Sequence, residues 1–390
     1  MSGINHPSGV NRPQIHLPAT GSVLWLAFFV NLNIQEILAV STSTTTPIDD
    51  GRDDRGVVYK KTIGTYYIHI DGRVLPCSLS SRLRKQLIYP TADPNSLRHT
   101  VRDVKALEHV DPVAVGDVVR FVDAHDGTGL IVEVLPRRNK LTRRTAVPMP
   151  GARPFEQVIV SNIDQVVPVF AAAAPTPKWN MLDRYLVSAE SLDLPSLICI
   201  TKLDLVQAED GSIDEELLEA MEEYCKIGYP VVLTSALTGY GLDELKQALW
   251  GRVSVFLGKS GVGKTALLNA LQPGLGLRVK EVNPITGKGK HTTTHLEMFP
   301  LTFGNPGETG PGTGGAIVDT PGMREFGLWD VDEGDLALFF PEMRPFVGRC
   351  KFGLDCQHDD EPGCAIRKAV SSGQISPHRY QSYMRLKEEV

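Results

Sequence analysis

The residues best suited to chemistry lie in a glycine-rich loop, Gly258 to Thr265, which has the spacing of a phosphate-binding loop. In such a loop the backbone N–H groups surround phosphate oxygens, Lys264 reaches the β- and γ-phosphates, and the Thr265 hydroxyl ligates Mg²⁺. The flanks agree, because residues 252–257 predict a buried strand and residues 266–271 predict a helix. The sequence therefore predicts a nucleotide site formed by Gly258, Lys259, Ser260, Gly261, Val262, Gly263, Lys264, Thr265 and Ala266.

A second phosphate-side motif, Asp319-Thr320-Pro321-Gly322, follows the apolar residues 315–318. We expect Asp319 to hold Mg²⁺ through water and the backbone N–H of Gly322 to approach the γ-phosphate. Alone, the four residues also make a common turn sequence. Their place downstream of the phosphate loop favours the nucleotide-site interpretation.

A base-recognition motif, Thr201-Lys202-Leu203-Asp204, precedes the phosphate loop. The Asp204 carboxylate can accept hydrogen bonds from the ring N–H and the exocyclic amine of guanine, a donor pair that adenine lacks. Lys202 is expected to lie along the base, while Thr201 replaces the usual Asn, a variation in which the motif resembles small GTPases of the Rho type. Alone, the motif is also common where helices start. The predicted base site comprises Thr201, Lys202, Asp204, Ser235 and Ala236.

The loop between the two phosphate-side motifs includes residues 287–295, which are rich in Gly and Thr and predict a first switch ordered by γ-phosphate and Mg²⁺. Either Thr292 or Thr293 is expected to sense the metal. Met323 stands where Ras-like enzymes place a water-orienting glutamine, and an apolar side chain cannot orient water. His291 is the nearest substitute, unless it is a surface residue of the loop. The predicted catalytic residues are His291, Lys264, Thr292 and Thr293.

A metal-binding pattern lies near the C-terminus, at Cys350, Cys356, His358 and Cys364. Three thiolates and one imidazole make a closed tetrahedral zinc site of the structural type, without an open position for catalysis. The alternative is a loop with unrelated cysteines. Only six cysteines occur in 390 residues, and half belong to this cluster. This usage favours a reducing, cytoplasmic compartment over a disulfide framework.

The order of these motifs is unusual, because the base-recognition motif comes before the phosphate loop, whereas ordinary GTPases have the reverse order. Sheet packing does not depend on where the chain begins, so a rotated order is physically allowed. The sequence therefore predicts a circularly permuted GTPase that uses GTP and Mg²⁺.

Taken together, the motifs resemble the RsgA family (ribosome small-subunit-dependent GTPase A), circularly permuted GTPases that act late in small-subunit maturation. The resemblance runs from about residue 56 to the C-terminus and includes the segments 290–294, 324–327 and 361–364. It implies an oligonucleotide-binding (OB) barrel before the GTPase domain, the small ribosomal subunit and its rRNA as partners, and subunit-stimulated hydrolysis. The sequence departs from the family in having Thr201, one extra residue before Cys356, and a glycine-rich insertion at 304–315. None of these removes a group that the mechanism needs.

Extended segments such as 65–70, 117–122 and 130–135 predict a small barrel over residues 56–150. Strands that alternate with helical stretches at 181–192 and 214–226 predict an α/β domain, a mostly parallel sheet with helices on both faces, over residues 151–328. Residues 329–390 complete the predicted architecture with a zinc-binding, mostly helical domain.

Residues 1–55 contain no site motif and predict a disordered extension, with a targeting role as the alternative. Their apolar run, residues 23–30, is too short to span a bilayer. We therefore expect no membrane partner.

The net charge of −6 excludes a generally basic nucleic-acid binder, although cations gather locally at residues 137–144, where the predicted barrel ends, and at residues 82–85. Local clusters of this kind suit RNA phosphates, and they are also typical of solvated faces. We expect rRNA rather than DNA as the nucleic acid, and nothing in the sequence demands more than a monomer.

Three functions are compatible with these motifs. The first is a GTPase that binds the small ribosomal subunit and leaves after stimulated hydrolysis. The second is a nucleotide-regulated rRNA-binding adaptor with vestigial hydrolysis, an alternative that Met323 keeps open. The third, an ATP-dependent enzyme of metabolism, is disfavoured by Asp204 and by the pair Ser235-Ala236.

Overall fold

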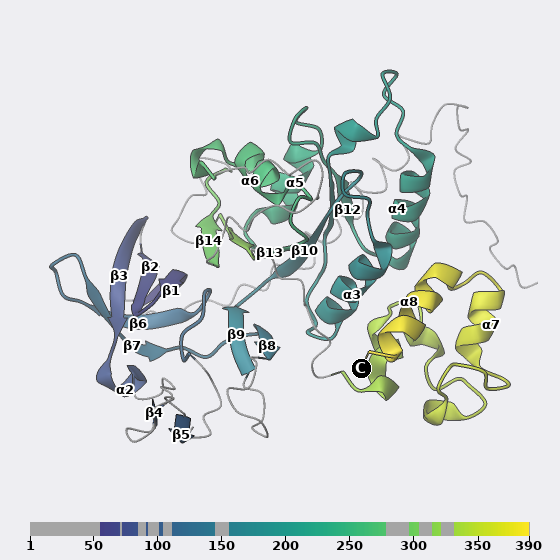
Figure 1. Ribbon diagram of the computed structural model, residues 1–390, viewed down its shortest axis with the longest axis horizontal. Coiled ribbons are helices and arrows are strands. Elements are labelled where there is room, and N and C mark those ends of the chain that lie inside the picture. Colours follow the sequence, from purple (N-terminus) through teal and green to yellow (C-terminus); the bar gives the residue numbers. More distant parts are fainter. Residues whose placement is uncertain are drawn as a thin grey trace, which may run out of the picture.

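Three bodies lie in a row in the computed structural model, with a β-barrel at one end, an α/β sheet in the centre and a helical domain at the other end (Figure 1). The structure describes residues 55–70, 72–84, 91–92, 101–103, 111–144, 156–277, 296–303, 314–320 and 331–389. Within these ranges no helix is long and apolar enough to cross a membrane. This architecture confirms the predicted fold class.

The barrel consists of five strands, β1 (Arg55–Thr62), β2 (Thr65–Ile70), β3 (Arg73–Leu79), β6 (Val118–Asp123) and β7 (Gly129–Val134). Their order is β1-β2-β3-β7-β6, and the pairing of β6 with β1 closes the barrel. Alternate residues such as Val58, Ile68 and Ile131 point inward and are fully buried. The barrel also carries the short helix α2 (Ser81–Arg84) and a small sheet of β4 (Thr91–Ala92) and β5 (Val101–Asp103).

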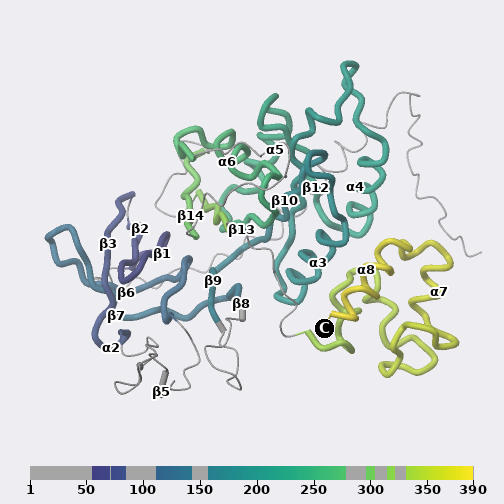
Figure 2. Tube along the Cα trace, viewed as in Figure 1, coloured from purple at the N-terminus to yellow at the C-terminus, as the bar shows by residue number. Residues whose placement is uncertain are grey.

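A two-stranded ribbon connects the barrel to the central sheet. Strands β8 (Lys140–Arg144) and β9 (Glu156–Ser161) pair in an antiparallel manner, and β9 is followed directly by the first strand of the α/β domain. The path of the chain along this ribbon is visible in Figure 2.

The central sheet has the order β12-β11-β10-β13-β15-β14, and only β14 runs antiparallel to its neighbour. Two apolar clusters cover its two faces, one with helices α3 and α4 and the other with α5 and α6. Helices on both faces of a mostly parallel sheet confirm the prediction. The strands are β10 (Gln165–Ala171), β11 (Ile198–Thr201), β12 (Val231–Leu233), β13 (Val253–Leu257), β14 (Glu297–Pro300) and β15 (Ala316–Asp319). The helices are α3 (Trp179–Glu190), α4 (Glu215–Ile227), α5 (Leu242–Leu249) and α6 (Lys264–Leu271), with 3-10 turns η1 (Leu203–Leu205) and η2 (Pro273–Leu275).

Local signals account for the ends of α4, predicted at residues 214–226. The Asp214 side chain caps the helix by accepting a hydrogen bond from the backbone N–H of Leu217 at 3.0 Å. Gly228, with φ of 114°, ends it in the left-handed conformation. Helix α3 lies two residues earlier than the predicted 181–192, and no side chain caps its first turn.

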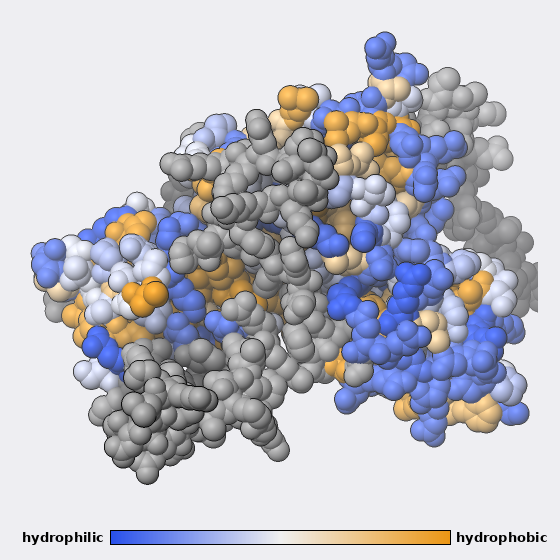
Figure 3. Space-filling model, in the orientation of Figure 1, coloured by the Kyte–Doolittle hydropathy of each residue, from blue (hydrophilic) through white to orange (hydrophobic). Residues whose placement is uncertain are grey.

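The C-terminal domain packs against α3 of the central domain. It is built from the 3-10 turns η3 (Glu333–Phe339), η4 (Arg344–Phe346) and η5 (Gly353–Asp355) and the helices α7 (Ala365–Ser371) and α8 (Pro377–Lys387). Its apolar core includes Val187 of α3, and Arg379 of α8 is fully buried against Asp183 of α3. The visible surface of this domain is largely hydrophilic (Figure 3).

Candidate nucleotide site and zinc centre

The phosphate loop follows β13 in the middle of the sheet and leads into α6, as predicted. Gly261 and Gly263 adopt φ values of 89° and 96°, a backbone region that only glycine enters easily. Such turns direct successive N–H groups inward, and the positive end of α6 adds to their attraction for phosphate. The loop therefore has the backbone geometry of an anion site.

Lys264 and Asp319 form the charged part of this site. The Lys264 ammonium group donates hydrogen bonds to the carbonyl oxygen of Gly258 and, at 3.4 Å, to that of Lys259. Burial lowers the pKa of Lys264, and the nearby Asp319 partly offsets this effect. Burial raises the pKa of Asp319, and Lys264 partly offsets that effect in turn. Each charge is therefore incompletely compensated, and phosphate and a cation would supply the missing partners.

The Asp319 carboxylate also shows that the site suits a divalent cation. Its Oδ1 atom is buried without a hydrogen-bond partner among the described residues. A buried carboxylate oxygen is costly unless it binds a donor or a metal. Thr265 follows Lys264 in the first turn of α6, and Asp319 ends β15, so one hydroxyl and one carboxylate are available as oxygen ligands of the kind Mg²⁺ prefers.

The base-recognition loop is tied directly to the phosphate loop. The Thr201 hydroxyl donates to the carbonyl oxygen of Val262 in the phosphate loop and also lies 3.2 Å from that of Phe170. The Thr201 hydroxyl therefore connects the two loops, at the position where the motif usually has Asn. Lys202 lies beside Gly263 with a left-handed backbone (φ of 58°), and burial lowers its pKa against the opposing effect of Asp204.

Asp204 is oriented by the second base loop. The Ser235 hydroxyl donates to Asp204 Oδ1 at 2.5 Å and accepts the backbone N–H groups of Leu237 and Thr238, each at 3.2 Å. Ser235 is buried, whereas Asp204 remains half-exposed. The structure thus brings Thr201, Lys202, Asp204, Ser235 and Ala236 together at the carboxyl ends of β11 and β12, next to the phosphate loop.

Four predicted residues of the phosphate side lie outside the described ranges. These are His291, Thr292, Thr293 and Gly322, and Met323 lies outside them too. Their roles remain predictions from the sequence.

The four predicted zinc ligands converge in the C-terminal domain. Their ligand atoms all lie within 4.8 Å of one another, and all four side chains are buried. His358 directs Nδ1 toward the sulfur atoms of Cys350 and Cys364, each at 3.5 Å. Burial raises the pKa of the Cys364 thiol, so a thiolate here needs a cation. Three sulfurs and one nitrogen at these separations fit tetrahedral Zn²⁺.

Backbone contacts shape this centre. The N–H of Ala365 donates to the sulfur of Cys350 at 3.2 Å, and that of Arg367 donates to the sulfur of Cys364 at 3.5 Å. The Tyr380 hydroxyl donates to the carbonyl oxygen of His358 at 2.6 Å. Gly353, with φ of 60°, begins the 3-10 turn that leads to Cys356.

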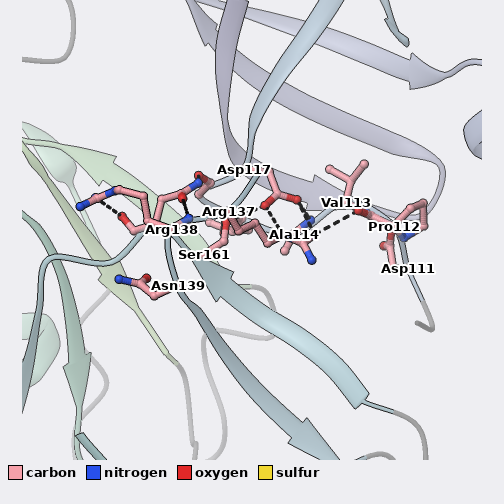
Figure 4. Close-up of polar contacts among 12 residues, drawn as sticks. Asp111, Pro112, Val113, Ala114, Asp117, Arg137, Arg138, Asn139 and Ser161 are labelled. Atoms are coloured by element: carbon pink, nitrogen blue, oxygen red, sulfur yellow. Dashed lines mark hydrogen bonds and ion pairs between the residues drawn. The ribbon is translucent and has the colours of Figure 1, made fainter. Parts of the chain in front are cut away.

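Two arginines of the first basic cluster form ion pairs within the molecule. Arg137 binds the buried Asp117 through two hydrogen bonds of 2.7 Å, and Ser161 donates to the same carboxylate at 2.6 Å (Figure 4). Arg138 donates to Asp164 at 2.8 Å. Asp117 therefore connects Arg137 to the end of β9 through Ser161, and Arg138 connects the barrel to the segment just before β10. Sequence reasoning missed this role, because the acidic partners are distant in the chain and carry no motif.

Comparisons with known proteins agree with this geometry. A family model described as RsgA GTPase matches residues 134–329. A protein of Gemmatimonas aurantiaca named small ribosomal subunit biogenesis GTPase RsgA is 45% identical over 280 residues, covering 71% of this chain and 84% of its own. A Bacteroides fragilis protein of the same name is 35% identical over 336 residues, covering 86% and 96%.

Two solved structures have the same overall arrangement. The crystal structure of YjeQ from Thermotoga maritima superposes with a TM-score of 0.60 at 30% identity, over 86% of this chain and 97% of that one. The structure of YloQ, described as a circularly permuted GTPase, gives a TM-score of 0.58 at 29% identity, over 88% and 97%.

Proposed function

Because this chain belongs to the RsgA GTPase family, we propose that it hydrolyses GTP during biogenesis of the small ribosomal subunit. One observation carries the chemical part of the proposal. Asp204 with Ser235 and Lys264 with Asp319 lie at the same edge of one sheet, and Thr201 connects the two halves. A guanine reader and a phosphate binder held together in this way are the parts that a GTPase needs.

The chain's own residues divide the work of binding GTP. Asp204, oriented by Ser235, accepts the two guanine donors, so an adenine nucleotide leaves its carboxylate unsatisfied. Lys264 exchanges the carbonyl oxygen of Gly258 for β- and γ-phosphate oxygens. Thr265 and Asp319 hold Mg²⁺, which neutralises charge that develops on the phosphates.

The remaining catalytic assignments rest on the sequence. We assign His291 the orientation of the attacking water, because Met323 cannot do so. One of Thr292 and Thr293 contacts the metal, and the N–H of Gly322 contacts the γ-phosphate. The site formed by Cys350, Cys356, His358 and Cys364 holds one structural Zn²⁺.

The rRNA contact of the barrel is assigned to α2 rather than to the cluster at residues 137–144. Arg82 and Arg84 are exposed, and within the described residues no carboxylate pairs with them. By contrast, several described cations of the barrel each have a carboxylate partner, namely Lys60, Lys61, Arg73, Arg120 and Arg137. Exposed guanidinium groups suit phosphate contact.

We further propose that the protein acts as a cytoplasmic monomer.

GTP turnover with and without purified small subunits tests the proposal, with ATP as the control nucleotide. We expect slow basal hydrolysis and stimulation of about a hundredfold or more, specific for GTP. Nucleotide-dependent subunit binding without faster turnover would instead identify the adaptor. His291→Ala separates the same two functions, because stimulated turnover collapses only if His291 acts in catalysis. A subunit that neither binds nor stimulates would exclude the ribosomal role.

A further inference from the structure

Strand β14 forms a bridge between the nucleotide site and the barrel. On one side Glu297 is the register partner of Asp319 on β15, and on the other side Glu297 is the register partner of Lys60 on β1. The barrel and the central sheet therefore form one continuous eleven-stranded sheet. In Figure 1, β14 lies between the barrel and β13.

The shape of β1 explains how a closed barrel reaches a second sheet. Its first half, Arg55–Val57, pairs with β6 and closes the barrel. The register of β1 with β2 then shifts between Val58 and Lys60, an irregularity that bends a strand. Because β6 no longer occupies this edge after the shift, the second half of β1 can pair with β14.

Side chains reinforce this pairing on both sides. Tyr59 packs against the core of the central domain, as does Leu296, which immediately precedes β14. On the barrel side the Tyr59 ring stacks on His69, with ring centroids 4.7 Å apart. The barrel therefore contacts the central domain through a packed aromatic side chain and contacts β14 through an ion pair.

Four charges extend from this contact to the phosphate loop. Lys60 Nζ lies 3.0 Å from Glu297 Oε2. Glu297 and Asp319 stand opposite each other on neighbouring strands, so their side chains occupy the same face of the sheet, and Asp319 interacts in turn with Lys264. Without Lys60, Glu297 would lose its ion-pair partner on the strand that borders Asp319.

We propose that Lys60 and Glu297 are a positioning pair for GTP hydrolysis, through which the barrel, once engaged with RNA, sets the position of Asp319. This inference rests on the proposed function. Neither residue touches the nucleotide. The pair acts through β14, whose displacement shifts the neighbouring end of β15.

The test compares charge variants in the full-length, zinc-loaded protein. Lys60→Met and Glu297→Gln each remove one member of the pair, and the double variant Lys60→Glu with Glu297→Lys restores it with reversed polarity. The matched control is Lys61→Met, because Lys61 follows in the same strand and binds Asp111 at 3.1 Å within the barrel. GTP turnover is measured against subunit concentration, which separates the stimulated kcat from the subunit concentration that gives half-stimulation.

We expect each single variant to lower the stimulated kcat about three- to fivefold, the scale of a partly exposed ion pair. The half-stimulating concentration should stay within about twofold, the charge-reversed double variant should regain most of the loss, and Lys61→Met should match wild type. Suppose that the subunit stimulates wild type. The inference is then wrong if the single variants have the wild-type stimulated kcat, or if the double variant does not regain the lost kcat, while the proposed function stands. If wild type itself is not stimulated, the proposed function fails first.

Discussion

Replacing Arg379 by Met tests how much the buried ion pair between the C-terminal and central domains contributes to stability. The guanidinium group is fully buried, and it binds Asp183 at 2.5 Å and Glu342 at 2.6 Å. It also lies 4.7 Å from the centre of the Phe340 ring. Burial opposes the charge, but Asp183 and Glu342 outweigh that effect and raise the pKa of Arg379. The substitution keeps most of the side-chain volume, removes the cation that Glu342 binds, and leaves Asp183 with His378, at 3.9 Å, as its basic neighbour.

The expected cost follows from the partners that remain. Removing one member of a buried ion pair typically costs about 3–5 kcal/mol. In the variant Asp183 still accepts hydrogen bonds from the Tyr224 hydroxyl, at 2.8 Å, and from the Ser382 hydroxyl. We therefore expect the free energy of unfolding to fall by about 3 kcal/mol, near the lower end of this range. Adding Asp183→Asn removes one stranded charge and should recover about 1 kcal/mol or more.

Zinc release provides a local assay, because the four proposed zinc ligands belong to the same domain as Arg379. The zinc-loaded protein is titrated with urea, and released metal is detected with a chromogenic chelator. With a typical slope of about 1–3 kcal/mol per molar urea, the midpoint should fall by about 1–3 M. Arg385→Met is the matched control, because Arg385 lies on the same helix and is exposed; it should change stability by no more than about 0.5 kcal/mol.

Two results would refute this reasoning. A cost below about 1 kcal/mol for Arg379→Met would show that the buried charges do not hold the domains together. Strict additivity of the two substitutions would show that Arg379 and Asp183 do not interact energetically.

Further predictions concern the two sites and the contact between the same two domains. Asp204→Ala should weaken GTP binding by about a hundredfold, because two hydrogen bonds to a charged acceptor are lost, while ATP binding stays unchanged in a fluorescent-nucleotide competition assay. Thr201→Val removes the hydroxyl that connects the base and phosphate loops and should raise the Kd for both GDP and GTP about five- to tenfold by calorimetry. Cys356→Ser should abolish bound zinc by elemental mass spectrometry and lower the thermal midpoint of the C-terminal domain. The Glu223 carboxylate, whose Oε1 lies 3.7 Å from the imidazole Nδ1, raises the pKa of His378 above its ordinary value of 6.5. The stabilisation from this contact is complete below pH 6.5 and is lost as the pH rises through the higher pKa of the folded state. As the pH rises above 6.5, the thermal midpoint should therefore fall more steeply in wild type than in His378→Gln.

The sequence alone determined the parts of the site whose geometry is local. The phosphate loop, the base-recognition motif and the cysteine cluster each lie within a short stretch, so covalent spacing already constrains which atoms can meet. The strand periods and the capping residue Asp214 are local in the same sense, and they predicted β2 and α4 to within a residue. The rotated order of the motifs was equally plain, because order along the chain is a property of the sequence.

Only the tertiary structure decided the pairings between distant segments. Arg137 stood in a basic run that suited RNA, yet it binds Asp117 inside the molecule. Arg379 meets Asp183 across 196 residues, and Lys60 meets Glu297 across 237. An arginine or lysine can pair with any carboxylate that comes within reach, and its own neighbours in the chain do not specify which. That choice depends on how strands and helices far apart in sequence pack against one another, and the whole fold sets this packing.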